Sequence, residues 1–146
     1  MAATTPAQQG DDTLRLGDIR EEWGWIRPAI EEILADNPTL SYIPEDVYAE
    51  VKAERAMLFV AEGGFAVTTT EVDRHTGDKT LLMWIYWSQP RKAPALFRHM
   101  EGIRQVAEAT GHSWIEARTK SERWGNALAH RGWVLDDLIY RKPVHE

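Results

Sequence analysis

The spacing of the apolar side chains changes along the chain from a helical period to a strand period. Over residues 18–35 large apolar side chains recur at intervals of three and four, which predicts a helix. From residue 57 the period falls to about two, and the run 81–87 is apolar throughout. A strand that is apolar on both faces is typical of a sheet centre covered on both sides. The pattern therefore predicts an α/β fold.

The order of the predicted elements defines the sheet further. A meander followed by a crossover helix indicates a mixed, mainly antiparallel sheet with helices on both faces, an α/β (α+β) arrangement. Pro28 should kink or restart the first helix, while Asp18 and Ser121 are suited to cap helices. The predicted elements are helices 18–35 and 44–53, strands 57–61, 65–72 and 80–87, helix 94–110, strand 112–118, a short helix from Ser121 to Gly132, and a last strand or strand pair over 133–141.

Length and composition limit the alternatives. The 146 residues suit one domain, which we expect over 13–146, and the small polar residues 1–12 predict a disordered tail. With no cysteine there is no disulfide or thiolate metal site, and the five histidines lack metal-ligand spacing. No apolar run approaches the length of a membrane span, so we expect a soluble protein.

Charge is divided unevenly along the chain. Residues 1–87 carry a net −9 and residues 88–146 a net +3, within a total of −6. The acidic first part argues against a nucleic-acid partner, whereas the basic second part suits an anionic ligand. Both parts are also consistent with ordinary solvated faces.

Seven tryptophans are many for this length, and most should lie in the core. Trp23 and Trp25 lie about 200° apart around a helix, so both cannot enter the same core. One of them is expected to contact a partner chain or another part of the fold.

The element order resembles that of the GNAT N-acetyltransferase superfamily. The resemblance is strongest near the end, where a strand over 114–118 and a short helix precede Arg131-Gly132-Trp133. The first part resembles GNAT-like proteins of tailed bacteriophages, with a tryptophan-bearing helix, Glu45-Asp46-Val47, and the Val-Thr-Thr-Thr-Glu-Val strand over 67–72.

The resemblance implies a pyrophosphate loop, Gln/Arg-x-x-Gly-x-Gly/Ala, before the long helix. Here the stretch is Ser-Gln-Pro-Arg-Lys-Ala-Pro-Ala over 88–95. Gln89 suits the first position, but Lys92 and Pro94 replace the small residues, and each proline lacks a backbone donor. If acetyl-CoA binds, Gln89, Arg91 and Lys92 are the candidate ligands.

The resemblance also implies catalytic groups that are missing from their usual places. Leu128 stands where many members have a general-acid tyrosine, and the central strand has no carboxylate base. Candidate replacements are Tyr86, Glu71, Glu116 and Tyr140, since acid–base chemistry needs position and pKa more than a particular residue. Each is also consistent with an ordinary strand residue.

These observations leave two functions open. The first is a phage-type GNAT fold that has lost acetyl transfer and acts through a protein partner, as a virion-associated or host-binding protein. We expect such a protein in the host cytoplasm or in the virion, where it could also form a homo-oligomer. A toxin–antitoxin or anti-defence binder is a variant of it. The alternative is a divergent acetyl-CoA-dependent N-acetyltransferase, with the amine entering between the first helices and strand residues 68–72.

Overall fold

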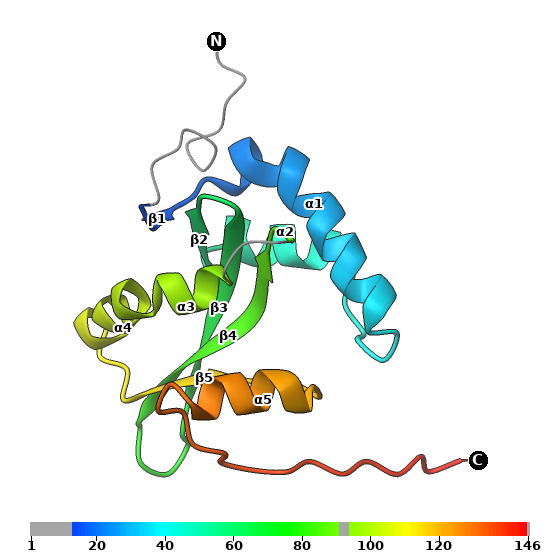
Figure 1. The fold of residues 1–146 in the computed structure, drawn as a ribbon, viewed down its shortest axis with the longest axis vertical. Coiled ribbons are helices and arrows are strands. Elements are labelled where there is room, and N and C mark those ends of the chain that lie inside the picture. Colours follow the sequence, from blue (N-terminus) through cyan, green and yellow to red (C-terminus); the bar gives the residue numbers. More distant parts are fainter. Residues whose placement is uncertain (1–12, 91–93, 146) are drawn as a thin grey trace.

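A computed structural model describes residues 13–90 and 94–145 (Figure 1). Its sheet has the strand order β1-β2-β3-β4-β5. The first four strands pair antiparallel in sequence order, and β5 lies parallel to β4. The strands are β1 (Arg15–Leu16), β2 (Met57–Ala61), β3 (Gly64–Val72), β4 (Lys79–Ser88) and β5 (Trp114–Ala117).

Helices cover both faces of this sheet, which confirms the predicted fold class. On one face, α1 (Ile19–Asp36) and α2 (Pro44–Lys52) share a core with β2, β3 and β4. On the other, α3 (Ala95–Arg98), α4 (Met100–Ala109) and α5 (Glu122–Ala129) share a second core with β4. In Figure 1 the helices α3, α4 and α5 lie apart from α1, with the sheet between the two groups.

The predicted helix caps are present. The Asp18 carboxylate accepts a hydrogen bond from the Arg20 N–H at 2.9 Å, and the Ser121 hydroxyl accepts one from the Trp124 N–H at 3.2 Å. Pro28 lies inside α1, which remains one helix through that position.

A β-bulge in β4 changes the direction of its side chains. Val67 pairs with Ile85 but the next residue, Thr68, pairs with Met83, so Trp84 is the extra residue. Met83 therefore packs in the α3–α4–α5 core, whereas Ile85 packs in the α1–α2 core. The strand is apolar on both faces, as predicted.

Two predicted elements need correction. The helix predicted over 94–110 is interrupted at His99, whose φ of −117° and ψ of 15° are not helical. The His99 N–H still donates to the Ala95 carbonyl, and the Ile103 N–H donates to the His99 carbonyl, so the interruption is one residue long. The helical spacing of apolar residues continues across His99, so the sequence pattern gives no sign of this interruption.

The last strand predicted over 133–141 does not form. Residues 133–143 have no assigned helix, strand or turn, and β5 is the final strand of the sheet. Strand formation needs a partner backbone, and the apolar pattern of this segment cannot supply one. The sequence also missed β1, because two residues carry no period; Arg15 pairs with Val60 and Leu16 with Phe59.

Trp23 and Trp25 both contact other parts of the fold. The Trp23 ring lies 5.1 Å from that of Tyr48 in α2, and the Trp25 ring lies 5.7 Å from that of Phe65 in β3. Neither contact requires a partner chain.

Candidate functional site

The candidate site is the opening where β4 and β5 separate. Their last pair is Met83 with Ala117, and β4 continues to Ser88. The Trp84 bulge follows this pair directly and redirects β4. Within the described ranges, β4 beyond the bulge has no strand partner on its β5 side.

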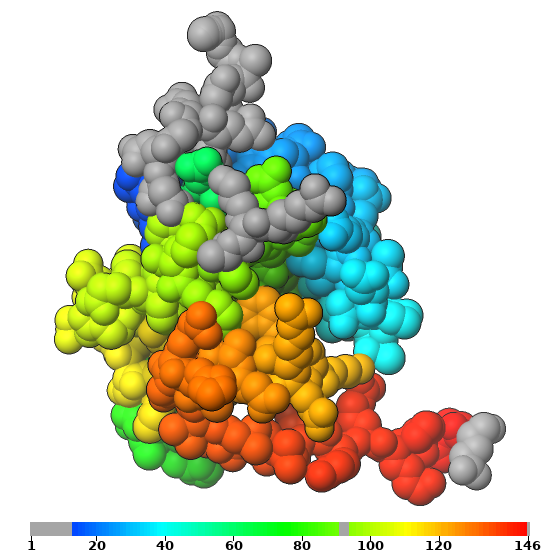
Figure 2. Space-filling view, in the orientation of Figure 1, coloured from blue at the N-terminus to red at the C-terminus, as the bar shows by residue number. Residues whose placement is uncertain are grey.

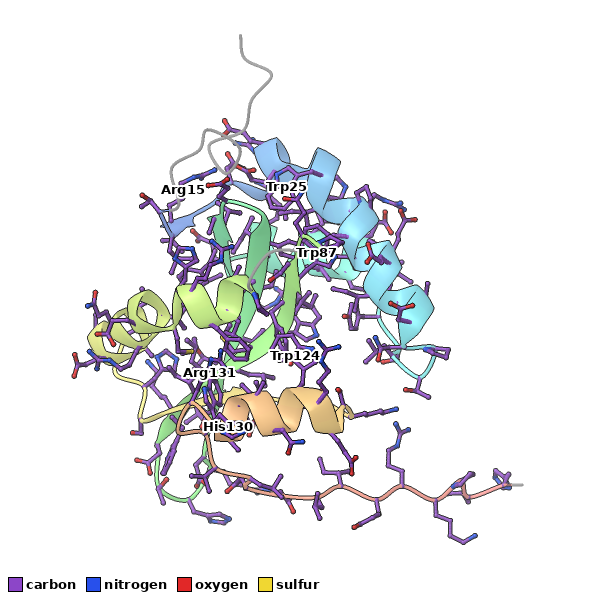
Figure 3. The ribbon with its side chains drawn as sticks, viewed as in Figure 1. Arg15, Trp25, Trp87, Trp124, His130 and Arg131 are labelled. Carbon is purple, nitrogen blue, oxygen red and sulfur yellow. The ribbon has the colours of Figure 1, made fainter. Side chains whose placement is uncertain are left out.

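Aromatic side chains border the opening on the α5 side. The Tyr86 ring lies 5.5 Å from that of Trp124, and the Trp124 ring lies 5.2 Å from that of Phe97. The Arg131 guanidinium carbon lies 3.9 Å from the centroid of the Phe97 ring, a cation–π contact. Figure 3 shows Trp124 and Arg131 coming from the region of α5 toward the sheet.

Tyr86 brings a proton donor into this group. Its hydroxyl donates a hydrogen bond to the Arg118 carbonyl just after β5, at 3.3 Å. Burial raises the pKa of Tyr86 above the ordinary tyrosine value, because the phenolate form loses its solvation. A tyrosine phenol is protonated at neutral pH even without this shift, so the Tyr86 hydroxyl has a proton to donate.

The opposite face is bordered by the loop between α1 and α2. The Tyr42 ring of that loop lies 5.3 Å from the Trp84 ring, edge to face. The Lys120 ammonium donates to the Thr39 hydroxyl at 2.8 Å and joins the same loop to the chain before α5. Burial also raises the pKa of Tyr42.

The start of α3 has few backbone donors to offer a phosphate. The Ala95 N–H donates to the Ser88 hydroxyl at 2.7 Å, and the Gln89 N–H donates to the Gly63 carbonyl at 2.6 Å. Pro90 and Pro94 have no N–H. A helix as short as α3 also adds little dipole.

The predicted site residues are only partly brought together. The Arg118 guanidinium binds the carboxylates of Glu71 and Glu116 at 3.0 and 2.9 Å, while the carbonyl of the same residue accepts from Tyr86. Three of the four predicted catalytic candidates thus meet at Arg118. Tyr140 does not, because it lies on the extended C-terminal segment with 87% of its surface exposed.

Of the predicted phosphate ligands, Gln89 is exposed at the end of β4, and Arg91 and Lys92 lie outside the described residues. Sequence analysis missed Arg118, Tyr42 and Trp124 as site residues. The only available signal was their position beside predicted element ends, which many other residues share.

Across residues 13–90 and 94–145, no group of three or more histidine, cysteine, aspartate or glutamate side chains is arranged to hold a metal ion. None of the helices in those ranges is both long and apolar enough to cross a membrane.

Comparisons with known proteins give matches among solved structures alone; no family model and no curated protein sequence matches the chain. A Clostridium acetobutylicum protein solved with acetyl-CoA, described as a predicted acetyltransferase, matches with a TM-score of 0.70 at 10% identity over 92% of this chain and 97% of that one. The glucosamine-6-phosphate N-acetyltransferase of Arabidopsis thaliana matches with a TM-score of 0.67 at 9% identity over 92% and 99%.

An acetyltransferase of Trypanosoma brucei matches with a TM-score of 0.67 at 14% identity over 92% of this chain and 100% of that one. At such identities the matches show the fold alone, and they span nearly the full length of both partners. The chain has the fold of the GNAT acetyltransferases.

Proposed function

We propose that the chain is an acyl-CoA-dependent N-acetyltransferase whose general acid is Tyr86. The observation that carries this proposal is the position of the Tyr86 hydroxyl, which lies 3.3 Å from the Arg118 carbonyl oxygen where β4 and β5 separate. The sequence has Leu128 where many GNAT members have a tyrosine, and Leu128 is buried in the core. Tyr86 approaches α5 from β4 instead, through its contact with Trp124.

The unpaired stretch of β4 suits the arm of an acyl-CoA. That arm is an extended chain with two amide groups, and an open strand edge binds such a chain through backbone hydrogen bonds. The acyl-CoA supplies a thioester whose acyl carbon can accept a neutral amine while the C–S bond breaks. The Tyr86 O–H would protonate the departing sulfur and would then regain a proton from solvent, to which the amine proton is lost.

The pyrophosphate requires a different binding mode from an amide cradle. The Ala95 and Gln89 N–H groups already donate hydrogen bonds within the protein, and the two prolines, Pro90 and Pro94, have no N–H group. Polar and cationic side chains can take the place of these two amides, so we assign the phosphates to Gln89, Arg91 and Lys92. This assignment predicts that the affinity for acetyl-CoA falls when salt screens the charges of the side chains and the phosphates.

The acceptor amine is assigned to the face of the opening that Tyr42 and Trp84 border. Their rings form an aromatic wall beside the loop between α1 and α2. An aromatic wall favours an amine carrying apolar or cationic groups near the reacting nitrogen.

The test of this proposal is acetyl-CoA binding by calorimetry, followed by turnover on a panel of amines. Tyr86→Phe should keep acetyl-CoA affinity and lower kcat roughly 100-fold, since a general acid contributes on that order. The control is Tyr140→Phe, whose exposed ring should leave kcat unchanged. Unchanged turnover in Tyr86→Phe would remove the assigned acid.

A second candidate is a GNAT fold that no longer transfers acyl groups and acts through a protein partner. It is favoured by the hydrogen bonds that the Ala95 and Gln89 N–H groups make within the protein, because these two donors are then not free to bind a phosphate. On this hypothesis the partner is a virion or host protein, as the phage-like pattern of the first helices and β3 suggests. Absence of acetyl-CoA binding up to millimolar ligand would favour this candidate over the enzyme.

A further inference from the structure

Arg118 lies at the point where β4 and β5 separate. It follows Ala117, which forms the last pair of the two strands with Met83. Residues 118 and 119 belong to no helix or strand, so the hydrogen bonds of the sheet no longer fix the backbone there. Contacts made by side chains then decide where this stretch lies.

Side chains from three strands meet at Arg118. Its Nη2 donates to Glu71 Oε1 of β3 at 3.0 Å and to Glu116 Oε1 of β5 at 2.9 Å. Its carbonyl oxygen accepts from the Tyr86 hydroxyl of β4 at 3.3 Å. Because β4 lies between β3 and β5 in the sheet, the contact with Glu71 reaches across β4. We call these three contacts the Arg118 clamp.

We propose that Arg118 is a positioning residue, which fixes the end of β5 relative to β3 and β4 and so holds the Tyr86 hydroxyl at the opening. It acts through Tyr86 and does not touch the substrate. The inference rests on the proposed function, in which the Tyr86 hydroxyl is the general acid. It makes Glu71 and Glu116 partners of Arg118, in place of the catalytic role considered from the sequence.

The two carboxylates explain why loss of the guanidinium would move the backbone. Glu71 and Glu116 bind the same nitrogen atom of Arg118, so they lie close together and would repel each other without it. The guanidinium and the carbonyl belong to one residue. A displaced residue 118 therefore also displaces the acceptor of the Tyr86 hydroxyl.

The clamp is suited to control geometry more than stability. The side chains of Arg118, Glu71 and Glu116 are 57%, 51% and 32% exposed, and ion pairs of such exposure add little to the free energy of unfolding. Proton transfer depends strongly on the position of the acid, and a displacement of about 1 Å can cost a large factor in rate. Loss of the clamp should therefore lower kcat in a protein that remains folded.

The test compares Arg118→Ala with Arg104→Ala, its matched control. Arg104 in α4 also joins two glutamates at the surface, with contacts of 2.8 Å to Glu101 and 3.8 Å to Glu108. Figure 2 shows α4 on the opposite side of the molecule from the cyan loop between α1 and α2, which borders the candidate site. Each substitution removes one positive charge and one pair of ion contacts.

Arg118→Ala should lower kcat about 10-fold and keep the acetyl-CoA affinity within about 3-fold of the wild type, because the acid is misplaced while the binding groups remain. Arg104→Ala should leave both quantities unchanged. Arg118→Lys should recover most of the lost kcat, since an ammonium still attracts both carboxylates. Circular dichroism checks the fold of each variant. A wild-type kcat in Arg118→Ala would overturn the proposal.

A double-mutant cycle separates the clamp from a direct catalytic role of Glu71. If Glu71 acts only through Arg118, the variant Glu71→Ala/Arg118→Ala should lower kcat no further than Arg118→Ala alone. Additive losses would mean that Glu71 contributes independently, which would overturn its assignment to the clamp.

A readout that needs no turnover separates this inference from the proposed function. In protein labelled with carbon-13 at the hydroxyl-bearing ring carbon of tyrosine, the Tyr86 NMR signal is the one that is missing from Tyr86→Phe. It should move in Arg118→Ala, because the carbonyl acceptor is displaced, and keep its wild-type position in Arg104→Ala. An unmoved signal in Arg118→Ala would refute the clamp even in an active enzyme. A moved signal in a protein without turnover would support the clamp and reject the assigned acid alone.

Discussion

At the scale of single residues, one buried carboxylate joins the start of the chain to the core. Glu22 in α1 is 1% exposed and accepts hydrogen bonds from the Arg15 guanidinium and from the Trp25 indole N–H, each at 2.7 Å. Trp25 packs on Phe65, which stacks on Trp87 at the end of β4. Figure 3 shows Trp25 and Trp87 close together. Glu22 therefore orients the first ring of an aromatic row that runs through Phe65 to Trp87 in β4.

Glu22→Ala should lower the free energy of unfolding by about 2–4 kcal/mol, because it leaves two buried or half-buried donors without an acceptor. Urea denaturation measures this change. Glu31→Ala, in the same helix, removes an exposed ion pair to Arg27 and should leave the free energy almost unchanged. Equal effects of the two substitutions would show that the Glu22 network contributes no more than a surface pair.

The residue-scale features that could be predicted are the local ones. Asp18 and Ser121 were identifiable as caps because a cap binds a backbone N–H within three residues. Arg118 was not identifiable, because its importance comes from Glu71, which lies far away in sequence. Tyr86 was named as a candidate, but its contact with α5 follows from the bulge at Trp84 and not from spacing.

At the scale of elements, apolar periodicity predicted most helices and strands with ends close to those observed. It failed where pairing with a distant segment decides the outcome, as in β1 and in the segment after Trp133. It also could not predict the bulge in β4, since the pairing shift is measured against β3. The geometry of the candidate opening depends on that bulge, so the site was less predictable than the fold.

The packing of α3 against the sheet can be tested at Gly64. A Cβ at this position would lie 2.6 Å from the Ala95 Cβ and 2.8 Å from the Trp87 carbonyl oxygen. Neither atom belongs to a flexible side chain, so α3 or the end of β4 must shift. Gly64→Ala should lower the free energy of unfolding by about 1–3 kcal/mol, and on the proposed function it should also weaken acetyl-CoA binding.

Gly24→Ala is the matched control for Gly64→Ala. A Cβ at Gly24, within α1, meets nothing within 4 Å. Alanine in a helix interior should therefore raise the free energy of unfolding by about 0.5–1 kcal/mol. The two substitutions add the same methyl group, so denaturant curves that move in the same direction would contradict the close packing of Gly64.

At the scale of the whole molecule, the sheet lies between two apolar cores, one on each of its faces. The order of the predicted elements already indicated this layered arrangement of helices on both faces of a sheet. The order of helices and strands was sufficient for the fold class because few layered arrangements satisfy it. Function was less predictable, since one fold can support many activities and the activity depends on a few side chains.

The charge distribution of the whole chain supports a last prediction. Residues 88–146 carry a net +3, whereas residues 1–87 carry −9. If Arg91 and Lys92 hold the phosphates in place of backbone N–H groups, acetyl-CoA affinity should fall on the order of 10-fold when salt rises from about 50 to about 500 mM, because salt screens exposed charges. Calorimetry across this range measures the change.

Arg91→Ala/Lys92→Ala should weaken binding at low salt and flatten the salt dependence, because the screened contacts are already lost. Lys52→Ala/Arg74→Ala removes the same net charge from α2 and from the loop before β4, and should retain both affinity and salt dependence. An affinity independent of salt would mean that backbone donors bind the phosphates after all. Parallel losses in both double variants would mean that long-range charge, and not a local site, attracts the ligand.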